Sequence, residues 1–160
     1  MIQKIIAIFT LSIAATAFPH ADHAHVDVDS AWIRPTVKGQ MGTGGFMKLT
    51  AREDLRLVRV STPAAKIAEI HEMRTSKADV NVMEMRAVAG IDLPKGKTVE
   101  FNPGGYHLML MELTQVLAVN STVPVTFYFK DPKGAESKLD LKIHVGRLPS
   151  AGDAAVMHKH

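Results

Sequence analysis

Apolar residues occupy every second position in two segments near the C-terminal end of the chain, 123–129 and 139–145. Successive side chains of a strand point to opposite faces, so this period of two predicts two strands that each bury one face. Segments 55–60 and 80–88 have the length of strands and are rich in β-branched residues. They are predicted to be strands as well.

Glycine and proline interrupt these segments often, and the interruptions predict turns. The predicted turns are 38–39, 42–45, 94–96, 102–105 and 131–134. No run of ten or more residues after the N-terminal segment has a clean helical period. Seven or more short strands with frequent turns favour an all-β sandwich or barrel. Met41 and Met47 are single methionines in this pattern and are interpreted as core residues.

The N-terminal segment has the features of a signal peptide. Lys4 supplies a positive charge, 5–14 is apolar, and Ala15-Thr16-Ala17 has the small-x-small form of a cleavage site. We therefore expect residues 1–17 to be removed, so that the exported protein starts at Phe18. Its expected location is the periplasm. A buried N-terminal helix is the alternative. The apolar run is too short for a membrane span, and no later segment is long enough.

The rest of the chain is predicted to form one domain with two short extensions. Residues 18–25 are polar and contain His20, His23 and His25. Residues 26–147 are expected to be the domain, a length sufficient for one hydrophobic core. Residues 148–160 are small and polar, end in Met157-His158-Lys159-His160, and are expected to be a flexible tail.

Composition and charge exclude several classes of function. The formal net charge is +3, and no block of lysine or arginine is present, which argues against nucleic-acid binding. The chain has no cysteine, which rules out disulfides, cysteine nucleophiles, thiolate zinc sites and blue-copper sites. No acidic pair or Ser/His/Asp arrangement supports hydrolysis. The sequence therefore predicts a protein that is not an enzyme.

Histidines and methionines gather in the middle of the chain, in 71–73 (His-Glu-Met), 83–85 (Met-Glu-Met) and 107–111 (His-Leu-Met-Leu-Met). If 106–111 is a strand, its leucines share one face, which is the natural core face, and its histidine and methionines share the other. The same spacing puts His71 and Met73 on one face, and Met83 and Met85 on one face. The turn predicted at 102–105 places His107 at the start of a strand, close to solvent.

Imidazole nitrogen and thioether sulfur, without thiolate, suit copper(I) better than zinc, calcium or magnesium. Methionines also fill gaps in hydrophobic cores without binding any metal. Residue spacing by itself leaves both interpretations open.

The segment 71–113, which includes VMEMRAVAGIDLPKGKTVEFNPGGYHLMLMEL, resembles the PCu(A)C family of periplasmic copper(I) chaperones, once labelled DUF461. The family signature is a histidine, ten residues, a methionine, twenty-one residues and then His-x-Met. Twenty-one residues separate Met85 from His107 here. The segments AWIRPT (31–36) and GTGGFMKLT (42–50) also resemble the family, so that the resemblance covers roughly residues 26 to 146.

One spacing departs from the family pattern. Thirteen residues separate His71 from Met85, three more than in the signature. The additional residues are assigned to 74–79, which is predicted to be a hairpin loop and where added length costs little loop-closure entropy. The departure leaves open whether Met83 replaces Met85 and whether Met73 takes part.

The resemblance implies a cupredoxin-like Greek-key β-sandwich or barrel that binds one copper(I). The ligands it implies are His71, Met85, His107 and Met109, with Met83 and Met73 as additional candidates. It also implies copper delivery to the copper-bearing subunit of cytochrome c oxidase, alongside a Sco-type thiol protein. A chain without cysteine would leave thiol chemistry to that partner. Copper buffering in the periplasm, without a dedicated acceptor, is the alternative function.

Some members of that family carry extensions rich in histidine and methionine that hold copper(II). By the same resemblance, copper(II) could bind at the two ends of this chain. The residues concerned are His20, His23 and His25 at one end and Met157, His158 and His160 at the other. Incidental histidines in solvated segments are the alternative.

Overall fold

Strands account for all the regular structure of the protein in the computed structural model, which describes residues 22–77 and 82–146. The strands are β1 (Asp22–His23), β2 (Val26–Ile33), β3 (Gly42–Ala51), β4 (Leu55–Ser61), β5 (Ala65–Thr75), β6 (Met83–Ala87), β7 (Ile91–Leu93), β8 (Thr98–Phe101), β9 (Tyr106–Leu113), β10 (Thr122–Lys130) and β11 (Glu136–Val145). The described residues contain no helix, and hence none that is long and apolar enough to cross a membrane.

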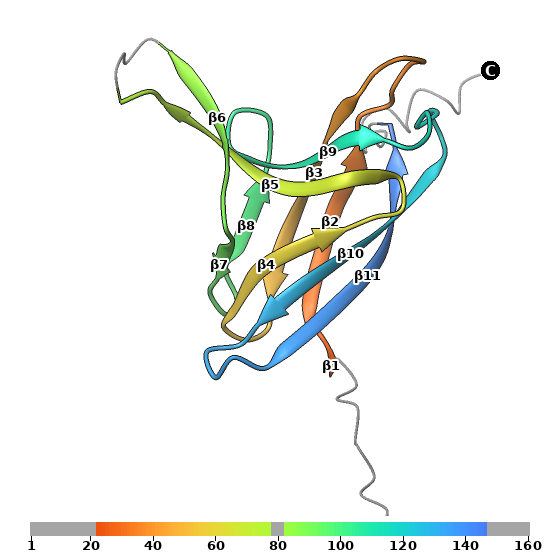
Figure 1. Cartoon of the computed structure of the whole chain (residues 1–160). Helices are drawn as coiled ribbons and strands as arrows, with labels where there is room; N and C mark the ends of the chain where they lie inside the picture. Colours follow the sequence, from red (N-terminus) through yellow and green to blue (C-terminus); the bar gives the residue numbers. More distant parts are fainter. Residues whose placement is uncertain (1–21, 78–81, 147–160) are drawn as a thin grey trace, which may run out of the picture.

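The strands form one curled sheet in the order β6-β5-β9-β8-β3-β2-β11-β10-β4-β7, and β1 pairs with β11. Strand β3 closes the curve because two strands, β9 and β8, share one of its edges, while β2 pairs with the other edge. Its first residues lie beside β9 and its later residues beside β8. Figure 1 shows β5 and β9 crossing one end of the other strands, with the β5–β6 hairpin projecting beyond them.

The core lies inside this curve and is made by alternate residues of the strands. The apolar positions predicted for β10 are all buried, and Phe127 and Phe129 are fully enclosed. In β9 the predicted core residues Leu108 and Leu110 are also fully buried. The all-β, cupredoxin-like fold class expected from the sequence is therefore confirmed. The predicted signal peptide and the tail from 148 lie outside the described residues.

The turn predicted at Gly42–Gly45 was wrong, because these residues begin β3. Glycine is needed there for close approach between strands rather than for a turn. A Cβ atom at Gly42 would lie 3.2 Å from the backbone oxygen of Leu110, and one at Gly45 would lie 3.2 Å from the Leu108 side chain. The glycines thus let β3 pass close to β9.

Three further expectations need correction. The loop predicted at 74–79 starts later, because Arg74 and Thr75 continue β5 and pair with β6. The strand predicted at 80–88 is shorter, with the bounds Met83–Ala87, and residues 78–81 lie outside the described residues. Of the two methionines assigned to the core, Met47 is buried, but Met41 is 65% exposed because it lies at the end of the β2–β3 connection.

Gly90 lies where the chain leaves the β5–β6 hairpin and turns towards β7, and a Cβ atom there would lie 2.6 Å from the backbone oxygen of Leu57. We expect Gly90→Ala to lower the free energy of unfolding by more than about 2–3 kcal/mol, since the clash adds to backbone strain. Gly134→Ala is the control, because Gly134 also has positive φ but nothing within 4 Å of an added Cβ. Urea denaturation should show a loss of only about 1–2 kcal/mol there. Equal losses would contradict the proposed close contact.

Candidate metal centre

Three pairs of residues on neighbouring strands bring the predicted ligands onto one face of the sheet. Residues directly opposite each other in antiparallel strands project from the same face. The pairs are Glu69 with Met109, His71 with His107 and Met73 with Met85. Since β9 buries its leucines on the other face, this face is left free of the core.

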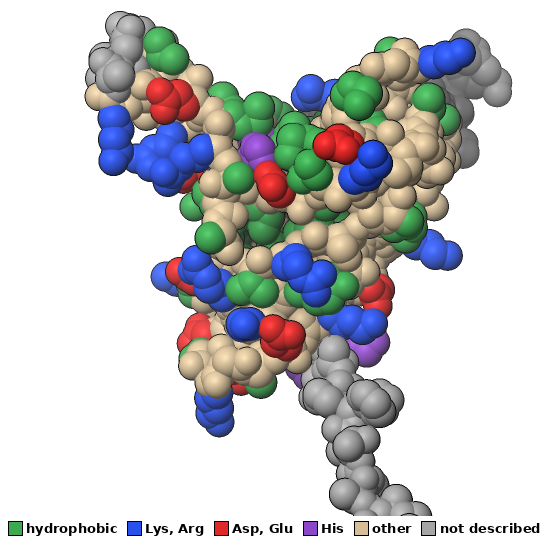
Figure 2. All heavy atoms as spheres, viewed as in Figure 1, with side chains coloured by type: hydrophobic (Ala, Val, Ile, Leu, Met, Phe, Trp, Pro, Cys, Tyr) green, Lys and Arg blue, Asp and Glu red, His purple; other side chains and the backbone are tan. Residues whose placement is uncertain are grey.

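Four soft donors of this face line one cleft of about 350 Å³: Met73, Met85, His107 and Met109. We call it the His/Met cleft. The other residues of its lining include Arg34 and Gln40, from the two ends of the β2–β3 connection, and Phe46 of β3. Figure 2 shows a hollow beside the projecting hairpin, with a histidine among hydrophobic side chains. The cleft is therefore open to solvent on one side.

The His107 ring is buried, with one nitrogen near a backbone carbonyl oxygen and the other near a methionine sulfur. Its Nδ1 lies 3.1 Å from the Gly105 carbonyl oxygen, which can only accept a hydrogen bond, so Nδ1 of the neutral ring carries the proton. Its Nε2 lies 3.0 Å from the sulfur of Met85. Metal–nitrogen and metal–sulfur bonds of roughly 2.0 and 2.3 Å put two donors of one ion about 3.5 Å apart at a tetrahedral angle. One ion would fit between these atoms after a small movement of the methionine.

The His71 ring lies beside that of His107, with 5.9 Å between ring centroids, but does not line the cleft. Its Nε2 lies 2.9 Å from a carboxylate oxygen of Glu69, so this nitrogen donates the hydrogen bond. Its Nδ1 is buried and has no hydrogen-bond partner among the described residues. Each histidine therefore has one nitrogen held by an oxygen acceptor and one that is free to bind a metal.

Met85 and Met83 differ in their surroundings, although both are half exposed. Met85 contacts His107 and lines the cleft. Met83 lies two pairs further out on the hairpin, opposite Thr75, whose hydroxyl lies 3.8 Å from its sulfur. It does not line the cleft. The structure thus brings Met85 to the histidines and leaves Met83 apart.

Residue pairing also shows two features that the sequence reasoning missed. Gly44 lies opposite Met109 and Gly42 opposite Met111, so no side chain of β3 projects over either methionine from these positions. Glu69 lies on the face of the sheet that carries His71, His107 and Met109, which we call the ligand face, and it contacts His71. The Glu-x-His-x-Met spacing of 69–73 carried the second signal, since residues two apart in a strand share a face.

The histidines near the N-terminus lie at the other end of the sheet from the His/Met cleft. His23 belongs to β1, opposite Lys138, and His25 lies 3.8 Å from Glu53. Figure 1 shows β1 far from the β5–β6 hairpin. His20, Met157, His158 and His160 lie outside the described residues.

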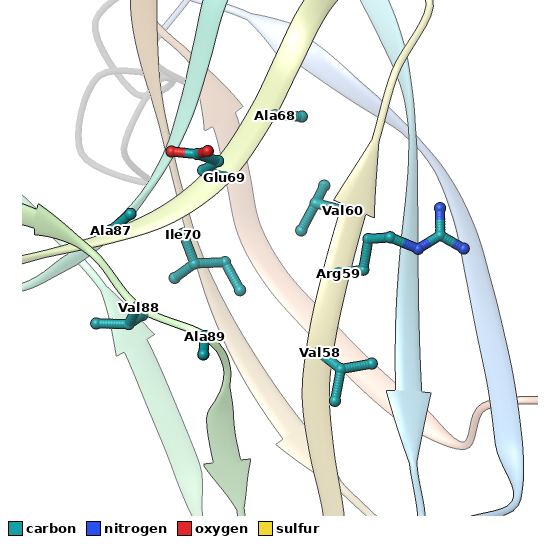
Figure 3. Close-up of a pocket in the computed structure, with 9 residues that line it drawn as sticks. All are labelled: Val58, Arg59, Val60, Ala68, Glu69, Ile70, Ala87, Val88 and Ala89. Carbon is teal, nitrogen blue, oxygen red and sulfur yellow. The ribbon is translucent and has the colours of Figure 1, made fainter.

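Elsewhere in the part of the chain that the structure describes, no competing cluster of metal donors is found. The hollow between β4 and β5 contains no histidine or methionine; its lining is mainly aliphatic (Figure 3). Within 22–77 and 82–146, no group of three or more histidine, aspartate or glutamate side chains converges as it would around a metal with nitrogen and oxygen ligands. Thioether sulfur is therefore the distinctive component of the cleft.

Comparison with known proteins places this chain in a family. The family model described as "Putative lipoprotein LpqE-like" matches residues 26–143. The chain belongs to the LpqE-like family. One relative of the LpqE-like chain is "Putative lipoprotein Lxx21020" of Leifsonia xyli subsp. xyli (strain CTCB07), with 31% identity over 106 residues. The match covers 66% of this chain and 63% of that relative, so it spans less than two thirds of the relative's length.

Two solved structures show the same fold as this LpqE-like chain. The apo PCuAC domain from PmoF1 matches with a TM-score of 0.56 and 21% identity, over 79% of this chain and 100% of that one. CuI-DR1885 from Deinococcus radiodurans matches with a TM-score of 0.52 and 24% identity, over 83% of this chain and 82% of that one. At the level of fold, the resemblance to PCu(A)C domains is confirmed.

The contacts of His107 predict its tautomer in the metal-free protein. We expect the proton on Nδ1 and a bare Nε2, because the Gly105 carbonyl can only accept. Two-bond ¹H–¹⁵N correlations of histidine-labelled protein, recorded at mildly alkaline pH, measure this directly. Exposed His25 should show averaged tautomers and serves as the control. A proton on Nε2 of His107 would mean that it donates to the Met85 sulfur, contrary to our assignment.

Proposed function

We propose that this LpqE-like protein is a non-enzymatic copper(I) carrier that binds one ion in the His/Met cleft. The observation that carries the proposal is the 3.0 Å approach of the bare Nε2 of His107 to the sulfur of Met85, inside a cleft that two further thioethers line. The proposed ligands are His71, Met85, His107 and Met109. Met73 is an additional donor, since it lines the same cleft opposite Met85.

The chemistry of the donors supports copper(I) over other ions. Thioethers and neutral imidazoles are soft or borderline ligands, whereas magnesium and calcium need oxygen ligands and structural zinc sites usually include thiolate. The buried, unpartnered Nδ1 of His71 is a polar atom for which a bound metal would supply the missing partner. A blue-copper electron-transfer site requires cysteine, which this chain lacks.

The related structures support the same cargo, because one of them is a CuI form and the other carries the PCuAC name. The family is named for lipoproteins, which supports action outside the cytoplasm, and we propose the periplasm. The open cleft supports exchange of the ion with another protein. A sealed site would hold its metal without a route for transfer.

We further propose that the copper is delivered to the copper-bearing subunit of cytochrome c oxidase, with a Sco-type protein supplying thiol chemistry. The absence of cysteine supports this division, because disulfide reduction needs a thiolate. Copper buffering without a dedicated acceptor uses the same cleft and is the second candidate. Copper(II) binding at the chain ends, including His158 and His160, remains a separate proposal.

A copper(I) competition titration against a chromogenic chelator tests the cleft. The wild-type protein should bind one tight equivalent. His107→Ala and Met109→Ala should each weaken binding by more than the roughly 10- to 100-fold that loss of an outer contact costs. Affinity should also fall as the pH is lowered, since a protonated imidazole cannot bind metal. Unchanged binding in both variants would contradict the proposal.

Replacing single methionines of the hairpin by leucine, which keeps their bulk, separates ligands from neighbours. We expect Met85→Leu to weaken copper(I) binding about 10-fold or more, and Met83→Leu, the matched control, to change it less than about 2-fold. Met73→Leu tests whether Met73 binds the ion directly or only lines the cleft. The same competition titration measures all three. A larger loss at Met83 than at Met85 would show that the hairpin binds copper in another register.

A further inference from the structure

We infer that Glu69 is a positioning residue for copper(I): by accepting the Nε2 proton of His71, it makes Nδ1 the nitrogen of that ring that binds the ion. The inference rests on the proposed function and deepens it. His107 would then bind through Nε2 and His71 through Nδ1, so the two neighbouring histidines use different nitrogens.

The contact between Glu69 and His71 has the geometry of a strong hydrogen bond. The carboxylate oxygen lies 2.9 Å from Nε2. A carboxylate can only accept when ionised, so the proton is on Nε2 and the lone pair of the neutral ring is on Nδ1. That lone pair is buried without a partner among the described residues. A buried acceptor without a partner is unfavourable, and binding a metal ion there removes the deficit.

Glu69 is directed to the ligand face by strand alternation. Its neighbour Ile70 is 4% exposed and packs in the core. Figure 3 shows the Glu69 and Ile70 side chains leaving β5 on different sides of the strand, at the edge of the hollow that both residues help to line. In the register of the sheet, Glu69 lies opposite Met109, one of the proposed ligands.

No lysine or arginine of the described residues competes for this carboxylate. Arg59, which lines the same hollow as Glu69, lies over the Tyr128 ring, 3.4 Å from its centroid. On β5 and β6, Lys66 lies 3.4 Å from Glu112 and Arg86 lies 3.5 Å from Glu72. The ion contact of Glu69 is with His71 alone. Its carboxylate is therefore available to orient the ring and to fix its tautomer.

Charge gives Glu69 a second effect. Two imidazoles and two thioethers are neutral, so they leave the charge of copper(I) uncompensated. The His107 ring is held only by a neutral backbone carbonyl. The Glu69 carboxylate supplies the one negative charge in direct contact with a proposed ligand. The Glu69–His71 pair should therefore contribute more to holding the cation than His107 with its carbonyl partner does.

Nuclear magnetic resonance of the copper(I)-loaded, ¹⁵N-histidine-labelled protein tests the assignment, since copper(I) is diamagnetic. We expect the Nε2 proton of His71 to persist after loading, and the ¹⁵N shift of Nδ1 to change. The inference is overturned if His71 loses its Nε2 proton on loading. It is also overturned if neither nitrogen of His71 responds while His107 does.

Variants of Glu69 test the positioning role. Glu69→Leu should weaken copper(I) binding about 10- to 100-fold and should remove the slowly exchanging Nε2 proton signal of metal-free His71. Glu69→Gln keeps an oxygen acceptor, so the proton signal should return while only part of the affinity does. Glu72→Leu is the control, because Glu72 is on the same strand and projects from the other face; its affinity should stay within about 2-fold of wild type.

These outcomes separate the inference from the proposed function. If wild-type protein binds one copper(I) and Glu69→Leu binds it equally well, Glu69 has no positioning role, and the carrier function stands. If wild-type protein binds no copper(I), the proposed function itself fails. If Glu69→Leu and Glu72→Leu lose affinity and unfolding free energy to the same extent, the effect is structural and the inference is rejected.

Discussion

The register between β5 and β9 is the constraint on which the candidate metal centre depends. It places His71 opposite His107 and Glu69 opposite Met109. A shift of one residue in a strand moves its side chains to the opposite face. Ile70, Leu108 and Leu110 are buried on the core face, so the cost of exposing them holds the register. Hydrophobic burial on one face of these strands therefore keeps the proposed ligands on the other face.

The cleft combines a buried histidine with an exposed methionine. His107 is 7% exposed and held by a backbone carbonyl, whereas Met85 is 51% exposed on a projecting hairpin. A buried imidazole beside an exposed thioether suits the proposed role of binding an ion and passing it on, because another protein can reach the exposed ligand first. Gly42 and Gly44 contribute by having no side chain where β3 passes the methionine row. The proposed metal centre and the fold thus depend on the same close passage of β3 along β9.

Much of the fold could be predicted from local patterns. The period of two in 123–129 identified β10 and its buried face, because alternation directly reports which side chains point inward. The leucine pair of β9 was identified for the same reason. The glycines at 42–45 were misread as a turn, since glycine permits both a turn and a close strand contact. Met41 was assigned to the core and is exposed, because a lone methionine has no periodicity that shows its direction.

For the metal centre, the sequence by itself determined the inventory of donors and the pairs that share a face of one strand. It contains no thiolate, and its family pattern indicated His71, Met85, His107 and Met109. Only the tertiary structure decided which strands lie side by side, and hence that Met85, not Met83, contacts His107. It also decided that Glu69 holds Nε2 of His71. Spacing along a strand follows from backbone geometry, whereas contacts across strands depend on a register set by burial of the whole core.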